Sequence, residues 1–447
     1  MPNPFESLPA GRGTIIFIMK TVCLLTLGCK VNQYETQAIR EQFSRLGLQE
    51  VGSRERADIY VINTCTVTLS ADRKSRQLIR AAHRKNPAAL IVVTGCYTEM
   101  NSAEIKKIAG VNLILNNSQK PILGRIVQEQ LFLQPPAIVK DQPPDSLSIN
   151  NFKDHTRAFV KIQDGCNNNC SYCKVRIVRG RSRSRRLEDI ISEINRLARA
   201  GFKEIVLVGI HLGAYGSDFK KRTNLIGLIE PIENIAGIEQ LRLSSIDPLD
   251  LTPALIKKIG ISKKICPHLH VALQNGDDYI LRKMNRCYRV KDIKKLVRNI
   301  RRHIKDVAIT LDIMVGFPGE KESNFTNTLG LLKEIKPARI HIFPYSKRPG
   351  TLAAGFKNVV SPQESRERYQ RLQEFAEKSS FIYRSRFINR KIKVLVETKR
   401  DPKTALLCGY SQNYIRVLFE GRDGLKNSIL PVKIVDVTID KTIGKVV

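Results

Sequence analysis

The feature that most constrains the fold is an alternation of short apolar runs with amphipathic, helix-like segments over residues 20–135. The apolar runs read TVCLLTLGC, ADIYVINTC, ALIVVTGC and NLILNN, and the segments between them include TQAIREQFSRLG and SADRKSRQLIRAAHRK. Such alternation is typical of a parallel sheet whose strands are connected by helices. The sequence therefore predicts an α/β fold that begins with a doubly wound parallel-sheet domain.

Three of these apolar runs end in a cysteine, namely Cys29, Cys65 and Cys96. The carboxyl ends of parallel strands share one edge of an open sheet, where ligands bind, so we expect these cysteines to converge in space. A lone cysteine is more often a small core residue, but three in the same structural position indicate a shared site. The remaining scattered cysteines are interpreted as structural: Cys23, Cys266, Cys287 and Cys408.

Six more strand-like runs follow between residues 157 and 346, separated by segments with helical spacing such as LEDIISEINRLARAG. Six βα units favour a partial barrel over a closed one of eight, with its ligand edge at the carboxyl ends of the strands. Near the end of the chain, the short runs IKVLVET, YIRVLFE and SILPVKIVDVTID, broken by turn signals, predict a small antiparallel β-barrel. The predicted organisation is a leader or misassigned start at 1–18, the sheet domain at 19–135, a Pro-rich linker at 136–150, the partial barrel at 151–380 and the small barrel at 381–447.

A cysteine triplet with C-x3-C-x2-C spacing, Cys166, Cys170 and Cys173, lies just past the first strand of the predicted partial barrel. Three thiolates from one tight loop can hold three irons of a four-iron, four-sulfur cluster and leave the fourth iron open to substrate or cofactor. Zinc is the alternative, but it needs a fourth ligand, for which His155 or a distant cysteine would have to serve. Ten cysteines in a chain without a secretory signal indicate a reducing compartment, and we expect the cytoplasm.

The charge balance points to a polyanionic partner, because 75 Lys and Arg against 42 Asp and Glu give a net charge of +33. Nucleic acid is the first candidate and a membrane is not expected, although a proteome rich in Lys and Arg would give the same total. The run RSRSRR predicts phosphate contacts from Arg181, Arg183, Arg185 and Arg186, with a solvated surface as the plainer alternative. The stretch KRPGT (347–351) is expected to face the substrate or to form an ordinary turn.

The triplet, with Tyr172 before its last cysteine, resembles the signature of radical S-adenosylmethionine enzymes. The whole chain from Met19 onward is similar to the methylthiotransferases of that superfamily, which carry a second three-cysteine set and a small RNA-binding barrel called TRAM. Within them, the threonylcarbamoyladenosine tRNA methylthiotransferases are the most similar, on strings such as TLGCKVNQYET, NTCTVT, DGCNNNCSYC, RLSSIDP, CPHLHVALQNGDDYIL and HIFPYSKRPGT.

The resemblance implies two 4Fe-4S clusters, one on Cys166, Cys170 and Cys173 and an auxiliary one on Cys29, Cys65 and Cys96. One S-adenosylmethionine methylates sulfur at the auxiliary cluster, and a second, cleaved at the radical cluster, activates C2 of the adenine. The implied product is the 2-methylthio derivative of N6-threonylcarbamoyladenosine, next to the anticodon of tRNAs that decode ANN codons. The implied electron donor is a flavodoxin or ferredoxin.

Several barrel residues are expected to shape the S-adenosylmethionine pocket, since glycines permit close backbone approach, although each could be a plain turn residue: Gly209, Ser244, Ser245, Gln274 and Gly316. In the small barrel, we expect aromatic residues among basic ones to stack on bases or to form core: Phe387, Tyr410, Tyr414 and Phe419. The alternatives are a methylthiotransferase for isopentenyladenosine tRNA or a ribosomal protein, and a non-catalytic iron-sulfur protein that binds RNA.

Overall fold

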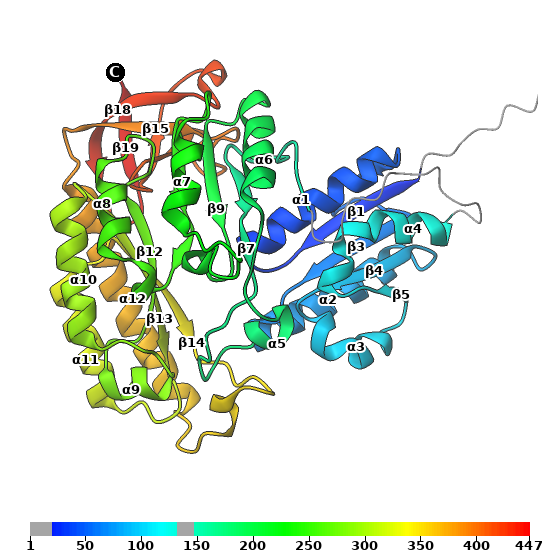
Figure 1. Ribbon diagram of the computed structural model, residues 1–447, viewed down its shortest axis with the longest axis horizontal. Helices are drawn as coiled ribbons and strands as arrows, with labels where there is room; N and C mark the ends of the chain where they lie inside the picture. Colours follow the sequence, from blue (N-terminus) through cyan, green and yellow to red (C-terminus); the bar gives the residue numbers. More distant parts are fainter. Residues whose placement is uncertain (1–19, 132–146) are drawn as a thin grey trace, which may run out of the picture.

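A computed structural model describes residues 20–131 and 147–447. The predicted leader at 1–18 and most of the predicted linker at 136–150 lie outside the described residues. Three units follow one another along the chain: an α/β domain, a larger central domain and a C-terminal barrel that covers one end of the central domain (Figure 1). The predicted fold class is therefore confirmed.

The N-terminal sheet is fully parallel, with the strand order β2-β1-β3-β4-β5. Its strands are β1 (Thr21–Thr26), β2 (Gln49–Glu50), β3 (Ile59–Thr64), β4 (Leu90–Gly95) and β5 (Val111–Ile114). Its helices are α1 (Lys30–Arg45), α2 (Leu69–Lys85), α3 (Thr98–Lys106), the short η1 (Asn117–Ile122) and α4 (Leu123–Leu131). Apolar residues of α1 and α4 pack on one face, and those of α2 and α3 on the other, as a doubly wound sheet requires.

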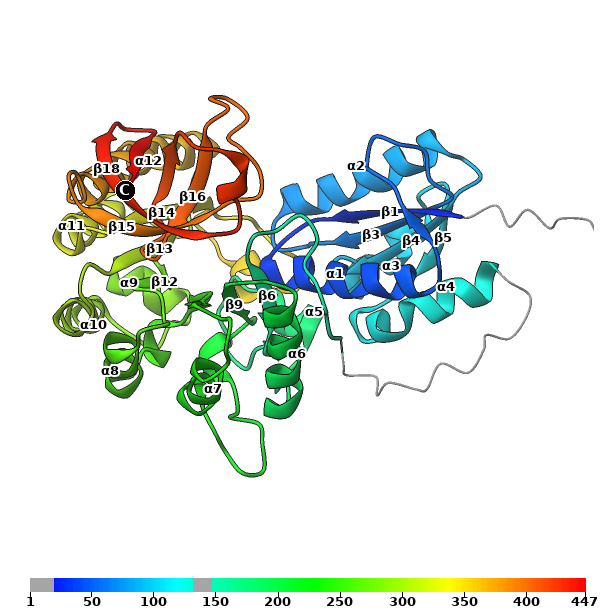
Figure 2. The same ribbon diagram turned by 90° about the horizontal axis from the view of Figure 1, so that it is seen from above.

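The central domain is a parallel partial barrel made of two sheets, β10-β9-β6 and β11-β12-β13-β14, joined by a bridge between Leu241 and Ile265. The strands are β6 (Ala158–Lys161), β9 (Glu204–Val208), β10 (Gln240–Leu243), β11 (Ser245–Ile246), β12 (His268–Gln274), β13 (Ala308–Val315) and β14 (Arg339–Pro344). The six predicted runs all form strands, and the run QLRLSS divides into β10 and β11. Strands β6 and β14 do not pair with each other, and the N-terminal domain lies beside β6 (Figure 2).

Helices cover the outside of the partial barrel, and their apolar positions form one large core with the strands. They are α6 (Leu187–Arg199), α7 (Leu225–Glu233), α8 (Pro253–Ile261), α9 (Asp278–Lys283), α10 (Val290–His303), α11 (Glu322–Ile335) and α12 (Pro362–Ser385). The cysteine triplet lies between two short pieces, the strand β7 (Gln163–Asp164), which pairs with β8 (Arg183–Ser184), and the helix α5 (Val175–Arg179). Short turns are η2 (Leu212–Ala214), η3 (Pro248–Asp250), η4 (Leu352–Gly355) and η5 (Asp423–Leu425).

The C-terminal unit is a closed barrel with the strand order β15-β16-β17-β19-β18. Its strands are β15 (Lys391–Val396), β16 (Leu407–Ser411), β17 (Arg416–Phe419), β18 (Ile429–Val437) and β19 (Thr442–Val446). The parallel pair β17 and β19 closes this otherwise antiparallel barrel. Strands β16 and β19 were not among the predicted ones, because LCGYS and TIGKV each carry an internal glycine that weakens the strand pattern.

Candidate metal centre

The three strand-end cysteines lie at one edge of the N-terminal sheet. Cys29 is the N-cap of α1 just after β1, Cys65 directly follows β3, and Cys96 directly follows β4. These strands are neighbours, and Thr64 and Gly95 are register partners. Each of the three thiols interacts electrostatically with the other two. The fold therefore gathers residues that are about thirty positions apart in sequence into one thiol group.

Two glycines permit this approach. Gly28 has φ +108°, and a Cβ on it would lie 2.9 Å from the Cβ and 3.1 Å from the Sγ of Cys65. Gly95 has φ +105°, and a Cβ on it would lie 2.3 Å from the carbonyl oxygen of Thr64. Side chains at these positions would separate the strand ends that carry the cysteines.

The triplet forms a compact loop at the edge of the central domain. The backbone N–H of Cys173 donates to the carbonyl of Cys170 at 3.1 Å, and that of Cys166 donates to Gly180 at 3.1 Å. Tyr172 packs with Met284 and Phe317 behind the loop. The thiol of Cys173 interacts electrostatically with those of Cys166 and Cys170.

Burial raises the pKa of three of these thiols, Cys65, Cys96 and Cys173, and so disfavours their thiolate form. Burial raises the pKa of Cys65 to about 11 and that of Cys173 to about 12. Iron binding at either group would release protons, since the thiolate is the ligand form. Loading of both sites is therefore expected to depend on pH.

Polar side chains surround the triplet sulfurs. Nη1 of Arg286 donates to the Sγ of Cys170 at 3.2 Å, and its Nη2 forms an ion pair with Asp247 at 2.6 Å. Nδ1 of His211 lies 3.7 Å from the Sγ of Cys166, and its Nε2 lies 2.8 Å from Asp250. Although burial lowers it, hydrogen bonds to Asp250 and Cys166 raise the pKa of His211 to about 10.

Each group offers three thiol donors, the number that a four-iron, four-sulfur cluster takes when one iron is left open. Within residues 20–131 and 147–447, no three or more His, Cys, Asp or Glu side chains are arranged to hold one metal ion. His155, the candidate fourth zinc ligand, instead packs on Phe152 and Phe159, with ring centroids 4.5 and 5.8 Å away. Three thiolates that each bind a different iron match the two groups.

The expected S-adenosylmethionine residues all lie at the carboxyl ends of barrel strands: Gly209 after β9, Ser244 and Ser245 around the β10–β11 junction, Gln274 at the end of β12 with φ +72°, and Gly316 after β13. Ser244 is buried, and its Oγ has no hydrogen-bond partner, which suits a ligand contact. Gly316 instead donates its N–H to Glu320 at 2.7 Å, and a Cβ on it would meet Ser365 of α12 at 2.6 Å. The close packing against Ser365 therefore explains why residue 316 is a glycine, and no ligand contact is needed for that explanation.

Polar residues fill the concave side of the barrel. Leu269, Val271, Leu311 and Ile313 point into the helix-covered core, so the alternate residues of β12 and β13 face the lumen. These include His270 and Asp312, whose Nε2 and Oδ1 atoms are 2.8 Å apart. His341 of β14 lies beside them, with its ring centroid 5.1 Å from that of His270. Burial is the main reason that the pKa of His341 falls to about 4, and the charge of Lys30, which follows Cys29, also lowers it.

The arginine run is divided between surface and interior. Arg181, Arg183 and Arg186 are exposed. Arg185 is turned inward, where its Nη2 pairs with Glu193 at 2.6 Å and its Nη1 donates to the hydroxyl of Tyr34 at 2.9 Å. Arg185 is therefore a structural residue and does not share the solvated face of the other three.

The aromatic residues of the C-terminal barrel divide into two buried phenylalanines and two half-buried tyrosines. Phe387 and Phe419 are each 1% exposed and lie in the core. The ring of Tyr414 lies 4.6 Å from the guanidinium of Arg242 and 4.8 Å from the ring of His268, and Tyr410 stacks on it at 5.0 Å. Phe387 and Phe419 are therefore core residues, whereas Tyr410 and Tyr414 are half-buried and line a pocket, so base stacking by these two tyrosines stays a prediction.

Sequence reasoning missed several side chains beside the cysteines: Asn32, Arg179, His211, Arg286 and Arg348. Asn32 and Arg348 stand in strings quoted above for the resemblance, but a residue's letter gives no sign of which way its side chain points. Arg348, in the stretch expected to face the substrate, is buried and donates to Thr66 and Asp72 of the N-terminal domain at 2.7 and 2.6 Å. No helix in the described ranges has the length and hydropathy of a bilayer span.

Comparison with known proteins matches both halves of this site. The model described as "Uncharacterized protein family UPF0004" matches residues 21–116, and the model "Radical SAM superfamily" matches residues 160–332. The "Threonylcarbamoyladenosine tRNA methylthiotransferase MtaB" of Bacillus subtilis (strain 168) is 39% identical over 423 residues, 93% of this chain and 94% of that protein. The "tRNA-2-methylthio-N(6)-dimethylallyladenosine synthase" of Clostridium tetani is 36% identical over 439 residues, 95% of this chain and 94% of that protein.

Among solved structures, the radical S-adenosylmethionine methyltransferase TsrM from Kitasatospora setae aligns with a TM-score of 0.55. The alignment covers 75% of this chain and 77% of that one at 13% sequence identity. Identity this low speaks for a shared fold alone.

Proposed function

The chain belongs to the radical S-adenosylmethionine tRNA methylthiotransferase family, and from that membership we propose that it adds a methylthio group to C2 of N6-threonylcarbamoyladenosine in tRNA. The observation that carries the proposal is the pair of three-cysteine groups at the junction of two domains, each at the carboxyl edge of a parallel sheet. The group of Cys166, Cys170 and Cys173 suits a cluster that generates the radical. The group of Cys29, Cys65 and Cys96 suits a cluster that supplies sulfur. An unactivated C–H bond with no leaving group requires chemistry of this kind.

The family implies S-adenosylmethionine and one 4Fe-4S cluster, which Cys166, Cys170 and Cys173 would hold. We propose a second cluster on Cys29, Cys65 and Cys96. When bound, these groups supply the radical and the sulfur, while the protein orients the reactants and excludes water. The C-terminal barrel contributes to that exclusion, because Tyr414 packs against the lumen residues Arg242 and His268.

The polar lumen supports threonylcarbamoyladenosine over isopentenyladenosine as substrate. A threonylcarbamoyl group brings a carboxylate and hydrogen-bonding atoms, whereas a dimethylallyl group is apolar. Burial lowers the pKa of Lys30, and no described carboxylate forms a salt bridge with it, so a substrate carboxylate would provide a partner. An apolar substituent would offer Lys30 no such partner.

The identities point the same way. Four relatives named MtaB are 36–39% identical to this chain, and four relatives named dimethylallyladenosine synthases are 33–36% identical. The difference in sequence identity is small, so the proposed substrate rests on the lumen residues and has to be tested by a direct assay.

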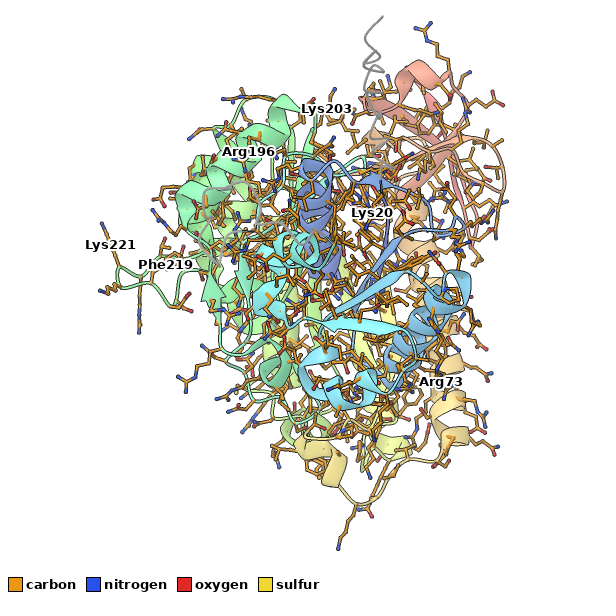
Figure 3. The ribbon with its side chains drawn as sticks, turned by 90° about the vertical axis from the view of Figure 1, so that its right-hand side faces the viewer. Lys20, Arg73, Arg196, Lys203, Phe219 and Lys221 are labelled. Carbon is orange, nitrogen blue, oxygen red and sulfur yellow. The ribbon has the colours of Figure 1, made fainter. Side chains whose placement is uncertain are left out.

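Basic surface residues support tRNA as the partner. Arg181, Arg183 and Arg186 are exposed beside the triplet loop. A loop before α7 carries the exposed Lys220, Lys221 and Arg222, and Lys221 projects away from the body of the protein (Figure 3). Such residues would contact phosphates without reading sequence. We expect tRNAs that decode ANN codons, a flavodoxin or ferredoxin as electron donor, and a cytoplasmic location.

The test is expression in a bacterial host that lacks its own methylthiotransferases, followed by mass spectrometry of the tRNA nucleosides. We expect the methylthio form of threonylcarbamoyladenosine, and its loss in Cys29→Ala and in Cys173→Ala. Methylthio-isopentenyladenosine alone would reassign the substrate. No methylthio nucleoside, with both clusters assembled, would favour the ribosomal-protein or non-catalytic alternatives.

A further inference from the structure

One arginine reaches from the radical-cluster loop to the auxiliary cysteines. Arg179 is the last residue of α5, six positions after Cys173, and its side chain is 1% exposed. Its Nε donates to the Sγ of Cys96 at 3.3 Å, and its Nη2 donates to the Oδ1 of Asn32 at 2.7 Å. That same Oδ1 lies 3.8 Å from the Sγ of Cys29. Arg179 thus touches one auxiliary cysteine directly and another through Asn32.

The remaining nitrogen of the guanidinium joins the two domains. Nη1 of Arg179 lies 2.9 Å from Glu35 of α1 and 3.0 Å from Asp164 of β7. Asp164 stands two residues before Cys166, so it belongs to the strand that leads into the triplet. The guanidinium is therefore tied on one side to the helix that begins at Cys29 and on the other to the loop that carries Cys166.

The charges of this buried group do not balance. Glu35 also pairs with Lys120 at 2.5 Å and with Lys161 at 3.2 Å, and Lys161 pairs with Asp164 at 3.2 Å. Three cations thus share two carboxylates. Although burial favours the neutral acid, Arg179 and Lys120 hold the pKa of Glu35 well below its usual range, so the carboxylate stays charged.

An uncompensated buried charge is costly, and the excess here is one positive charge. The anion that faces it is the ligand form of Cys96, because Nε of Arg179 points at that sulfur. Loss of the Arg179 charge would leave two cations with two carboxylates, a balanced set. The extra positive charge is therefore not needed to balance the carboxylates, and it is available to stabilise the thiolate form of Cys96.

We propose that Arg179 is a positioning residue that fixes the auxiliary cluster against the radical-cluster loop and raises the reduction potential of the auxiliary cluster. This inference rests on the proposed second cluster. An N–H donor and a positive charge at a ligand sulfur stabilise the more negative, reduced form, which raises the potential. Because Nη1 bonds Asp164 while Nε bonds Cys96, a change at Arg179 alters the potential and the alignment of the two sites together.

The first measurement uses the full chain with Cys166, Cys170 and Cys173 all changed to Ala, so that only the auxiliary cluster assembles. Its midpoint potential is measured by an anaerobic redox titration followed by electron paramagnetic resonance. In Arg179→Gln we expect the reduction equilibrium to shift at least tenfold toward the oxidised form, which is about 59 mV for one electron. Arg179→Lys keeps the charge but not the fork of donors, so its shift should be smaller.

The matched control is Arg242→Gln, which removes another buried arginine. Arg242 pairs with Glu204 at 2.8 Å and contacts no cluster cysteine. It is expected to lower stability and leave the potential unchanged. An equal shift in Arg242→Gln would mean that any buried arginine has this effect, and would overturn the inference.

The second measurement uses the chain with all its cysteines and compares 5′-deoxyadenosine with methylthiolated nucleoside. Misalignment in Arg179→Gln should raise that ratio several-fold, because radical generation at the triplet continues while sulfur transfer fails. An unchanged potential together with an unchanged ratio would overturn the role of Arg179. If the triple-Ala parent with Arg179 intact binds no iron, the auxiliary cluster itself is refuted and this inference with it. If Arg179→Gln does not hold iron, the potential of Arg179→Lys decides.

Discussion

Substitution of Gly95 by alanine tests whether the ends of β3 and β4 set the auxiliary site. A Cβ on Gly95 would lie 2.3 Å from the carbonyl oxygen and 2.5 Å from the nitrogen of Thr64, both backbone atoms just before Cys65. The positive φ costs about 1–3 kcal/mol, and the overpacking costs a further ~1–3 kcal/mol. The total of about 2–6 kcal/mol is concentrated between Cys65 and Cys96, so relief of the clash must move one cysteine away from the other.

The assay is iron counting after anaerobic reconstitution, with S-adenosylmethionine cleavage as a second readout. The unsubstituted chain should hold about eight irons, and Gly95→Ala about four, with cleavage to 5′-deoxyadenosine retained at the triplet. The control is Gly47→Ala, where φ is +73° but nothing lies within 4 Å of the added Cβ. It costs only the backbone term, about 1–2 kcal/mol, and should keep about eight irons. About eight irons in Gly95→Ala would refute the reasoning.

Three further predictions follow from the same contacts. Tyr414→Ala should lower the free energy of unfolding by about 2 kcal/mol in a denaturant titration, because the ring packs on Arg242. An unchanged denaturation midpoint would contradict this packing contribution. Arg183→Ala should weaken tRNA binding and reduce the slope of log K against log salt by about 1. Arg185→Ala should instead lower the free energy of unfolding by about 3–5 kcal/mol, because it removes the ion-pair partner of the buried Glu193. A reversed pattern would contradict the placement of the two arginines. Burial and neighbouring charges lower the pKa of His341 to about 4. On acidification the unfolded chain therefore binds this proton first, and the free energy of unfolding falls between about pH 6.5 and pH 4. His341→Gln should lose less stability than the parent chain over that pH range, and an equal loss would count against the lowered pKa.

Most of the strand pattern was predictable, because the longer strands of the parallel sheets are apolar-rich runs between amphipathic helices. The placement of Cys29, Cys65 and Cys96 followed from the same rule, since parallel strands present their carboxyl ends at one edge. The small barrel was harder. Its strands are short, and β16 and β19 each contain a glycine, so neither gave a clear period-2 pattern.

The side chains around the cysteines could not be predicted, because their roles depend on how two domains meet. Arg185 and Arg183 stand two positions apart in one basic run, yet the first pairs with buried Glu193 and the second is exposed. Charge counting along the chain treats them alike. Likewise, Tyr414 lies between β16 and β17 in sequence, but its neighbours in space include Arg242 and His268 of the central barrel, which no sequence pattern connects to it.

The junction between the domains is held by directional polar contacts, and this follows from where the two sites lie. Each site is at the carboxyl edge of a sheet, so both edges must face each other for the sites to meet. Apolar packing tolerates small sliding motions, whereas a hydrogen bond fails when its geometry changes. Arg179 and Arg348 both extend from the central domain into the N-terminal one, and they end at Cys96 and at Thr66, the residue after Cys65. Two buried arginines thus fix two neighbouring strand ends, which sets the distance and the relative rotation of the cysteine groups.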